Sequence, residues 1–342
     1  MSYLFPLLRP AFIALIASLI SVPLLRNLAL RIDFVDLPGP HKIHSRPFAL
    51  LGGVGIFLSF ALAVAFVSRA ELPVQAIVAG AGLVMVLGLY DDRRGIHPAL
   101  KLLGQAIAAS LVIACGVKVH FLPSLYLSIP FTLLWIVGIT NAFNLLDNMD
   151  GLSAGVAFIS ACTFAIVAGR YLDLGPEQMQ TVILASSLAG ACLGFLPYNL
   201  YRASIFMGDA GSMVLGFVLA SVSALGSWHS PTITTSVLIP VLILAYPIFD
   251  TFLVSILRIQ RGVAFYKGGR DHSSHRLTYL GLSRLEAVLL IYLFCLTHAF
   301  AAVLVSAVTF RLALIALFMS ACTLFIFGMV LRKAPLPGRE GT

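Results

Sequence analysis

The chain has 342 residues, of which 60% are hydrophobic and only 11% charged, and its formal net charge is +8. A soluble domain carries roughly 25% charged residues, so this composition excludes an ordinary soluble globular domain. No repeat, low-complexity tract or soluble domain is visible in the sequence. We therefore expect a single integral-membrane domain over residues 1–342.

Apolar segments recur along the whole chain, and about 20 mostly apolar residues are enough for a helix to cross a bilayer. In chain order, the predicted spans cover residues 6–25, 51–68, 73–90, 100–117, 128–145, 152–169, 179–196, 210–227, 232–257, 286–308 and 312–331. Pro130 lies in the fifth span, and Pro240 and Pro247 are expected to kink the ninth. Each span is apolar all round, which does not fit a barrel of alternating strands. The predicted fold is an all-α polytopic membrane protein of about eleven transmembrane helices.

The charges between the spans predict the orientation. When the connections are assigned alternately to two faces, 17 of the Lys and Arg residues share the second face and 5 the first. The positive-inside rule makes the second face cytoplasmic, which puts the N-terminus outside and the C-terminus inside a plasma (inner) membrane. The net charge is thus a topology signal and not evidence for nucleic acid. Eleven acidic residues also share this face against 3 on the other, and they predict cytoplasmic catalytic loops.

The first such loop, residues 33–53, contains three prolines, two basic residues (Lys42 and Arg46) and His44. Cationic donors beside the glycine pair Gly52 and Gly53 could hold a phosphate. The alternative is a basic juxtamembrane turn that lies against anionic lipid.

The second loop begins with the adjacent acids Asp91 and Asp92 at the end of a span. Two carboxylates there are costly unless a cation pairs with them, and carboxylate oxygens suit a hard divalent ion. Lys101 and Gln105 follow as i, i+4 neighbours on one helical face. The alternative is a solvated loop end whose charge is neutralised by Arg93 and Arg94.

The third loop follows the fifth span, and its Asn141, Asn144 and Asp147 recur every three residues before Asp150. Helical geometry places the first three on one face. A polar stripe at a membrane edge needs partners, and a nucleotide or a metal ion would supply them. A helix C-cap explains only the last few residues.

The fourth loop contains Asn199 and the run Phe206-Met-Gly-Asp209-Ala-Gly immediately before an apolar span. Glycines allow close backbone approach, and the N-terminus of the following helix favours bound phosphate. The alternative is that Asp209 simply caps this helix.

The fifth segment begins with Asp250, Arg258 and Arg261 and continues to Asp271, His272, His275 and Arg276. Histidines flanked by arginines form an anion-binding and acid–base set. A basic loop on the membrane surface is the alternative.

Together, and in this order, the five segments resemble the polyprenyl-phosphate N-acetylhexosamine-1-phosphate transferase family, of the glycosyltransferase family 4 type. The resemblance covers residues 33 to about 285. It implies that a polyprenyl phosphate such as undecaprenyl phosphate attacks the β-phosphorus of a UDP-sugar at the cytoplasmic face, with release of UMP. It also implies Mg²⁺ as the cofactor, with Mn²⁺ as an alternative ion, membrane lipid as surroundings, and the first step of a cell-envelope glycan pathway. A homodimer is left open.

Residue by residue, the resemblance and the chemistry of the loops together predict three sets of roles. Catalysis is assigned to Asp91, Asp92, Asp147, Asp209 and His272. Substrate binding is assigned to Lys42, His44, Lys101, Asn141, Asn144, Asp150, Asn199, Phe206 (by stacking on uracil), His275 and Arg276. The metal ligands are Asp209 and Asp92.

Two segments depart from the family pattern. Asn148 and Met149 separate Asp147 from Asp150, where the family commonly has Asp-Gly-Leu-Asp-Gly, and the histidine loop has no consecutive triplet. The second departure argues against a muramoyl-pentapeptide donor and favours an N-acetylglucosamine-like one. The resemblance leaves open direct attack or passage through a phosphorylated aspartate, and we favour direct attack.

Three other classes compete with this hypothesis. A polytopic scaffold or lipid-binding structural protein would not need so many carboxylates opposed to phosphate-binding donors. A secondary transporter would favour ionisable residues near the membrane midplane and internal symmetry, whereas these carboxylates lie at span ends. Asp147-x-x-Asp150-Gly151 also resembles the start of the CDP-alcohol phosphatidyltransferase motif, but the Ala-Arg expected after the glycine is missing.

Overall fold

The structure is a computed structural model, and it describes residues 4–37, 47–68, 71–119, 121–122, 124–228, 233–260, 262, 269 and 271–334. The chain divides into two compact units, Met1–Ser227 (unit 1) and Trp228–Thr342 (unit 2), which are described separately here. The expectation of one functional transferase domain over residues 1–342 stays a prediction.

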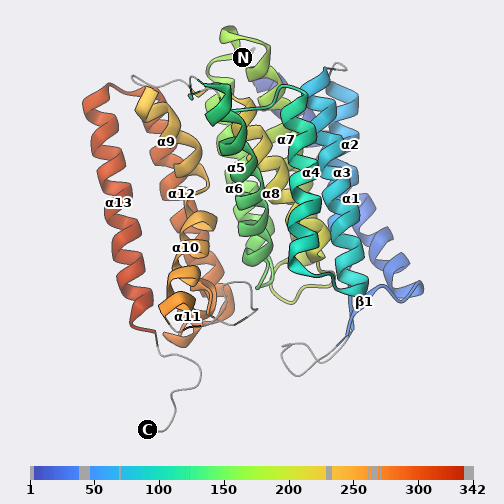
Figure 1. The fold of residues 1–342 in the computed structure, drawn as a ribbon. Helices are drawn as coiled ribbons and strands as arrows, with labels where there is room; N and C mark the ends of the chain where they lie inside the picture. Colours follow the sequence, from blue (N-terminus) through green and yellow to red (C-terminus); the bar gives the residue numbers. More distant parts are fainter. Residues whose placement is uncertain are drawn as a thin grey trace. The chain divides into compact units, whose positions relative to one another are not determined.

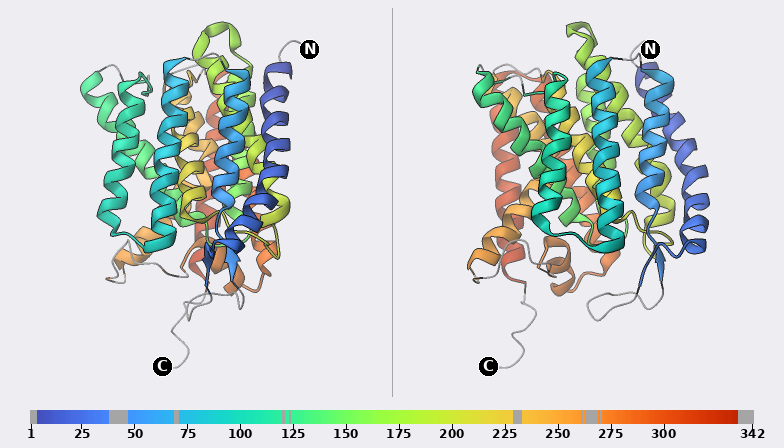
Figure 2. Two further views of the ribbon diagram at one scale, coloured as in Figure 1. Left: turned by 90° about the vertical axis from the view of Figure 1, so that its right-hand side faces the viewer. Right: turned by 45° about the vertical axis from the view of Figure 1, so that its right-hand side comes forward.

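Unit 1 is a helical bundle with a small hairpin at one end (Figure 1). Its helices are α1 (Leu4–Arg31), α2 (Gly52–Val67), α3 (Leu72–Arg94), α4 (Pro98–Ala114), α5 (Leu125–Leu146), α6 (Leu152–Gly169), α7 (Pro176–Asn199) and α8 (Gly208–Leu225), with the 3-10 turn η1 (Leu172–Leu174). The strands β1 (Val35–Asp36) and β2 (Phe48–Ala49) pair antiparallel. The connections after α1, α3, α5 and α7 lie at the same end of this unit in all three ribbon views (Figures 1 and 2).

The centre of unit 1 is formed by α6, α7 and α8, which are the most buried of its apolar helices. Helix α8 packs against α3 and α5, and α7 packs against α1 and α6. Glycines allow the close approach of α8 to its neighbours. A Cβ on Gly88 of α3 would lie 2.4 Å from the Ala210 backbone, and one on Gly53 of α2 would lie 2.2 Å from the Gly211 amide nitrogen. The N-terminal end of α8 is therefore held directly against α2 and α3.

Unit 2 contains α9 (Ile233–Ile243), α10 (Ala245–Gln260), α11 (Ser273–Tyr279), α12 (Arg284–Ala307) and α13 (Phe310–Arg332). Helices α9 and α10 form a bent pair with an angle of 75° between them. The break at Leu244 lies between Pro240 and Pro247, so the predicted kink in the ninth span is confirmed. Proline lacks the amide hydrogen that a continuous helix would use there.

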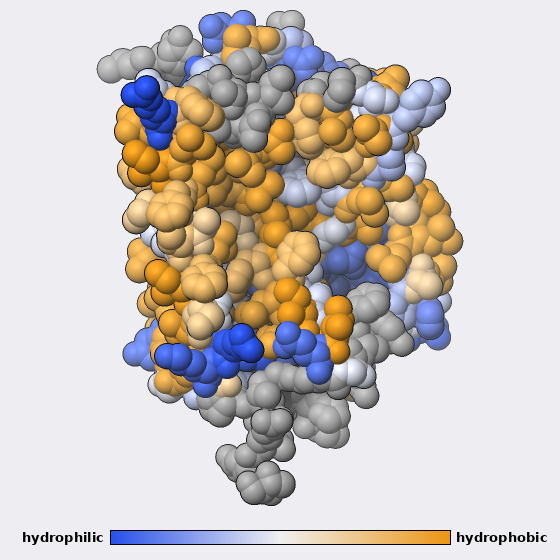
Figure 3. All heavy atoms as spheres, turned by 60° about the vertical axis from the view of Figure 1, so that its left-hand side comes forward, coloured by the Kyte–Doolittle hydropathy of each residue, from blue (hydrophilic) through white to orange (hydrophobic). Residues whose placement is uncertain are grey.

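The all-α membrane fold is confirmed, and each predicted span coincides with one helix or, for residues 232–257, with the bent pair. Within the described ranges, eight helices are long and apolar enough to cross a bilayer, and the bent pair makes a ninth; α2 and α4 are shorter apolar helices of 16 and 17 residues. Figure 3 shows a broad apolar band on one face of the molecule, with hydrophilic side chains gathered below it.

Candidate active site

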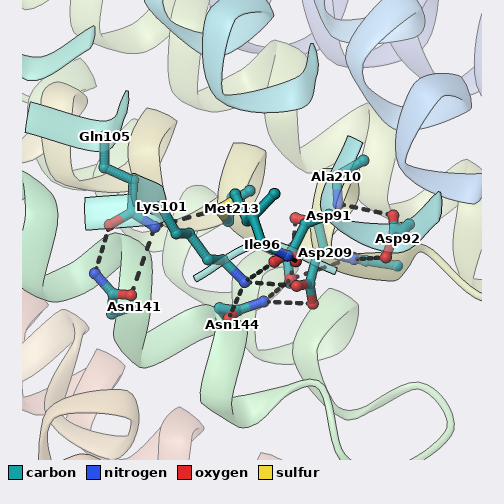
Figure 4. A network of polar contacts seen from close by, with 12 residues as sticks. Asp91, Asp92, Ile96, Lys101, Gln105, Asn141, Asn144, Asp209, Ala210 and Met213 are labelled. Carbon is teal, nitrogen blue, oxygen red and sulfur yellow. Dashed lines mark hydrogen bonds and ion pairs between the residues drawn. The ribbon is translucent and has the colours of Figure 1, made fainter. Parts of the chain in front are cut away.

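The acidic cluster, defined here as Asp91, Lys101, Asn144 and Asp209, lies where three of the connections of unit 1 meet (Figure 4). Asp91 is in the last turn of α3, Lys101 is in the first turn of α4, and Asp209 is in the first turn of α8. Four of the predicted site residues, far apart in sequence, are thus in direct contact.

The Lys101 ammonium is the centre of the acidic cluster. Its Nζ lies 2.8 Å from Asp91 Oδ2 and 2.5 Å from Asp209 Oδ2, and it donates to Asn144 Oδ1 at 3.0 Å. An ammonium has three donors, so three oxygen atoms from three helices accept all of them. The Lys101 and Asp91 side chains are each 13% exposed, whereas that of Asp209 is 36% exposed. The cluster is therefore partly open on the Asp209 side.

Both the oxygen and the nitrogen of the Asn144 side-chain amide make hydrogen bonds within the cluster. Its Nδ2 donates to Asp209 Oδ1 at 2.8 Å and to Ser212 Oγ at 3.0 Å. One turn earlier on α5, Asn141 Nδ2 donates to Gln105 Oε1 at 2.6 Å, and Gln105 is fully buried. The predicted stripe on α5 therefore packs against the predicted Lys101–Gln105 face of α4, and Asn141 joins the two helices one turn below the cluster.

Asp92 points away from its neighbour and binds the backbone of α8. Its Oδ1 accepts from the Asp209 amide at 2.9 Å and its Oδ2 from the Ala210 amide at 3.3 Å. These amides belong to the first turn of α8, where backbone N–H groups have no hydrogen-bond acceptor within their own helix. A carboxylate at this position also interacts favourably with the helix dipole. Gly208 has a φ of +67°, and a Cβ on it would lie 2.5 Å from Asp92 Oδ2. The contact thus depends on a glycine at this position.

Asp147 and Asp150 lie in the connection between α5 and α6. Burial, reinforced by the neighbouring carboxylates of the site, raises the pKa of Asp147 to about 8. Asp150 Oδ2 accepts from the Ala203 amide at 3.1 Å. Asn199 accepts from the Gly151 amide and donates to Ile205 O, both at 3.0 Å. Asp150 and Asn199 therefore fasten the third and fourth connections to each other.

Phe206 stacks on Phe48, with ring centroids 4.6 Å apart and 14° between the ring planes. The backbones beside these rings are also joined, since the Phe206 amide donates to Ala49 O at 2.9 Å and the Gly52 amide donates to Phe206 O at 3.1 Å. One side of the predicted base-stacking ring is thus covered by an aromatic side chain that the sequence pattern did not single out. Lys42 and His44, predicted in the same loop, lie outside the described residues.

The predicted residues His272, His275 and Arg276 lie in unit 2, where all three are buried. We call Asp250, Arg258, Asp271 and His272 the paired cluster. His272 Nδ1 lies 2.8 Å from Asp250 Oδ2, and the Ser273 amide donates to Asp250 Oδ1 at 2.7 Å. Arg258 makes two bonds to Asp271, of 2.8 and 2.7 Å.

Burial opposes ionisation of Asp271, but the Arg258 guanidinium outweighs it and holds the pKa of this carboxyl below its usual value. The partners of the paired cluster, Asp250 and Arg258, were not among the predicted site residues. Their signal in the sequence is the presence of charged residues in an otherwise apolar helix, which marks groups that need a partner.

The fold and the acidic cluster define a polytopic membrane protein with a carboxylate, amide and lysine site at one end of its helices. Residues 74–227 match the profile described as "Glycosyl transferase family 4". The chain is 36% identical to a probable undecaprenyl-phosphate N-acetylglucosaminyl 1-phosphate transferase of Bacillus subtilis, over 90% of this chain and 87% of the relative.

Two further relatives agree. A decaprenyl-phosphate N-acetylglucosaminephosphotransferase of Mycolicibacterium smegmatis is 34% identical over 87% of this chain and 82% of its own. An undecaprenyl-phosphate alpha-N-acetylglucosaminyl 1-phosphate transferase of Yersinia pestis is 26% identical over 90% of this chain and 87% of the relative. The chain therefore belongs to the polyprenyl-phosphate N-acetylhexosamine-1-phosphate transferase family that its sequence resembles.

Proposed function

We propose that this protein transfers N-acetylglucosamine 1-phosphate from UDP-N-acetylglucosamine to a polyprenyl phosphate such as undecaprenyl phosphate, and that it releases UMP. The observation that carries this proposal is the acidic cluster: three oxygen atoms from separate helices converge on one cation in a chain of this transferase family. The relatives are named as transferases, and nothing in the comparisons supports the secondary-transporter alternative.

The proposed reaction needs charge control more than covalent help from the protein. In phosphoryl transfer, negative charge is spread over the phosphate oxygens, and positioning with electrostatic stabilisation provides most of the catalysis. An oxygen of the lipid phosphate attacks the β-phosphorus directly, and the bond to the α-phosphate breaks as UMP leaves. Lys101 supplies a cation for the phosphate oxygens, and the Asn144 amide supplies a neutral donor and acceptor beside it.

The donor set of the acidic cluster fits Mg²⁺. Carboxylate and amide oxygens are the ligands that this ion prefers, and an ammonium already lies among three of them. Within the described residues, no three His, Cys, Asp or Glu side chains form a ligand set by themselves, so the Asn144 amide oxygen would join Asp209 and Asp91. When bound, the ion would neutralise charge that develops on the diphosphate and the leaving group.

Asp92 is less well placed for the metal. Both of its carboxylate oxygens accept backbone amides of α8, which favours Asp91 as the acid that faces the ion. The role of Asp92 as a metal ligand stays a prediction, as do those of Asp147 and Asp150 near the nucleotide.

The nucleotide and the sugar would use the remaining predicted residues. Phe206 offers an aromatic ring for uracil, backed by Phe48. That His272, His275 and Arg276 of unit 2, all of them buried, contact phosphate or sugar oxygens stays a prediction. Since the isoprenoid tail stays in the hydrocarbon, its phosphate lies at the membrane surface, where a site at the helix ends can reach it.

The cytoplasmic position of the acidic cluster and an external N-terminus follow from the positive-inside rule. We propose the inner membrane and a cell-envelope glycan pathway on the same basis. A homodimer stays a prediction.

The proposal is tested with purified protein, radiolabelled UDP-sugars and undecaprenyl phosphate in detergent. We expect label from UDP-N-acetylglucosamine to enter the lipid phase in the presence of Mg²⁺, and label from UDP-N-acetylmuramoyl-pentapeptide to stay in the aqueous phase. An Asp209→Asn sample is the negative control. If none of several UDP-sugars labels the lipid, the proposed function is wrong.

A further inference from the structure

Lys101 has contacts that go beyond those of a phosphate-binding lysine. Its ammonium touches Asp91 Oδ2, Asp209 Oδ2 and Asn144 Oδ1, at 2.8, 2.5 and 3.0 Å. These three oxygens are of the kinds that would bind a divalent ion, and they converge on the nitrogen from three helices. The lysine therefore occupies the position that the proposed metal would need.

The charges of the cluster explain why a cation is present there. Two carboxylates, Asp91 and Asp209, face each other in a partly buried place, and without a positive charge between them their repulsion would be strong. A lysine ammonium is a compact point charge on a flexible four-carbon stem. It can lie between the acids in one state of the protein and leave them in another without any movement of the backbone.

The backbone of α4 is fixed around this side chain. Gln105, one turn after Lys101, is fully buried and bonded to Asn141 of α5. His97 caps the start of the helix, where its Nδ1 accepts from the Ala99 amide at 3.3 Å. The Lys101 side chain can therefore leave the acidic cluster while the start of α4 stays in place.

We infer that Lys101 is the resident counter-ion of Asp91 and Asp209, and that a divalent ion binds this site by displacing its ammonium. This inference rests on the proposed metal-dependent function. An ammonium and a divalent cation bound to the same three oxygens would lie close enough to repel each other strongly. The affinity of the site for the metal is therefore set by competition with Lys101.

The exchange has a consequence for the substrate. With Asp91 and Asp209 neutralised by a bound ion, the Lys101 ammonium would be free to bind phosphate oxygens of the diphosphate. Because coupling between two ligands is reciprocal, bound metal raises the affinity for the diphosphate, and bound diphosphate raises the affinity for the metal. A site without the lysine would bind metal more tightly and transfer sugar phosphate more slowly.

The test is a titration of purified, detergent-solubilised protein with Mn²⁺ in the absence of substrates, with free Mn²⁺ followed by electron paramagnetic resonance. We compare the wild type with Lys101→Met and Lys101→Gln, which remove the charge. Arg93→Met is the matched control. It removes one charge from the same connection, but its guanidinium binds Asp33 O and lies over the Phe34 ring instead of entering the cluster.

We expect both Lys101 variants to lower the Kd for Mn²⁺ by about 5- to 150-fold, and Arg93→Met to leave it near the wild-type value. Their melting temperatures, measured in the same detergent, identify any variant that fails to fold. If the folded Lys101 variants bind Mn²⁺ no more tightly than the wild type, the inference is overturned.

An Asp209→Asn sample separates this outcome from failure of the proposed site. If Mn²⁺ binds the wild type and Asp209→Asn equally, the metal assignment itself is wrong. The transfer assay with UDP-N-acetylglucosamine, which needs no Lys101 variant, tests the proposed function independently.

Discussion

In the acidic cluster of unit 1 a single lysine serves two carboxylates, whereas in the paired cluster of unit 2 each carboxylate has a cationic or imidazole partner of its own. The Arg258 and His272 side chains are 2% and 5% exposed, but that of Asp209 is 36% exposed. Matched, buried pairs are costly to break, whereas Lys101 is shared between two carboxylates, one of which, Asp209, is partly open. The comparison suggests that unit 2 uses its charges to hold structure and that unit 1 keeps its charges available for a ligand.

The largest effect is expected from a variant that breaks the paired cluster. Arg258→Met leaves the Asp271 carboxylate buried without its bidentate partner, which typically costs about 3–5 kcal/mol of stability. Thermal unfolding in detergent should show a large fall in melting temperature. The double variant Arg258→Met/Asp271→Leu, which removes both charges, should recover much of it; equal melting temperatures for wild type and Arg258→Met would contradict the comparison.

The same pair predicts a dependence of stability on pH. Since the pKa of Asp271 in the folded protein is held below its usual value of 3.8, its contribution is present above about pH 4 and is lost as the pH falls through the folded pKa. The melting temperature of the wild type should therefore fall on acidification, and the double variant should show a smaller fall. Identical pH profiles would show that the pair does not stabilise the fold.

The next largest effect is expected on activity, from Asp209→Asn. The change keeps the shape of the side chain but removes the charge that faces Lys101, so turnover should fall by at least about 10²–10³-fold while the melting temperature stays close to the wild-type value. UMP release is the measurement. Asp173→Asn, at the exposed turn η1, is the control that should keep full activity. Normal turnover in Asp209→Asn would remove the residue from the site.

A smaller effect is expected from Asp92→Ala. It removes the side chain that caps α8, and a lost cap costs about 0.5–2 kcal/mol. Since Asp209 is in that first turn, turnover should fall together with stability. Ser283→Ala, which removes the capping box of α12 in unit 2, should reduce stability by a similar amount and leave turnover unchanged. If turnover fell equally in Asp92→Ala and Ser283→Ala, the loss would follow from lower stability in general and not from the position of Asp92 beside the acidic cluster.

The smallest effect is expected from Phe48→Leu. The ring pair with Phe206 is worth about 0.5–1.5 kcal/mol, so the affinity for UDP, measured by isothermal titration calorimetry, should fall by up to roughly tenfold. Phe131→Leu, which breaks the stack of Phe131 on Trp135, is the control. If UDP binds Phe48→Leu as tightly as the wild type, Phe48 does not support the base-binding ring.

Hydropathy alone predicted the long apolar helices of both units, because each must present apolar side chains to lipid or to the bundle. It did not predict the short polar helix α11 (Ser273–Tyr279), which lies within the fifth predicted segment. The spacing of Asn141 and Asn144 also predicted a common face, and that face lies against α4. Helical geometry acts within a few residues, so local sequence is enough for such features.

The sequence could not predict which of the two adjacent acids, Asp91 or Asp92, contacts Lys101 and which binds the backbone of α8. Neighbouring residues on a helix point about 100° apart, so one acid faces Lys101 and the other faces α8. Which acid does which depends on the close approach of Gly88 to Ala210, a contact between distant parts of the chain. The Asp250–His272 pair depends in the same way on how the bent helix α10 meets α11.

The most direct test of the account is to measure both products of one reaction, with UDP-N-acetylglucosamine, undecaprenyl phosphate and Mg²⁺ supplied to purified protein. We predict that UMP and lipid-linked sugar phosphate appear in equal amounts, and that both disappear in Asp209→Asn. Release of UMP without a lipid product, or equal product formation by Asp209→Asn, would contradict a transferase centred on the acidic cluster.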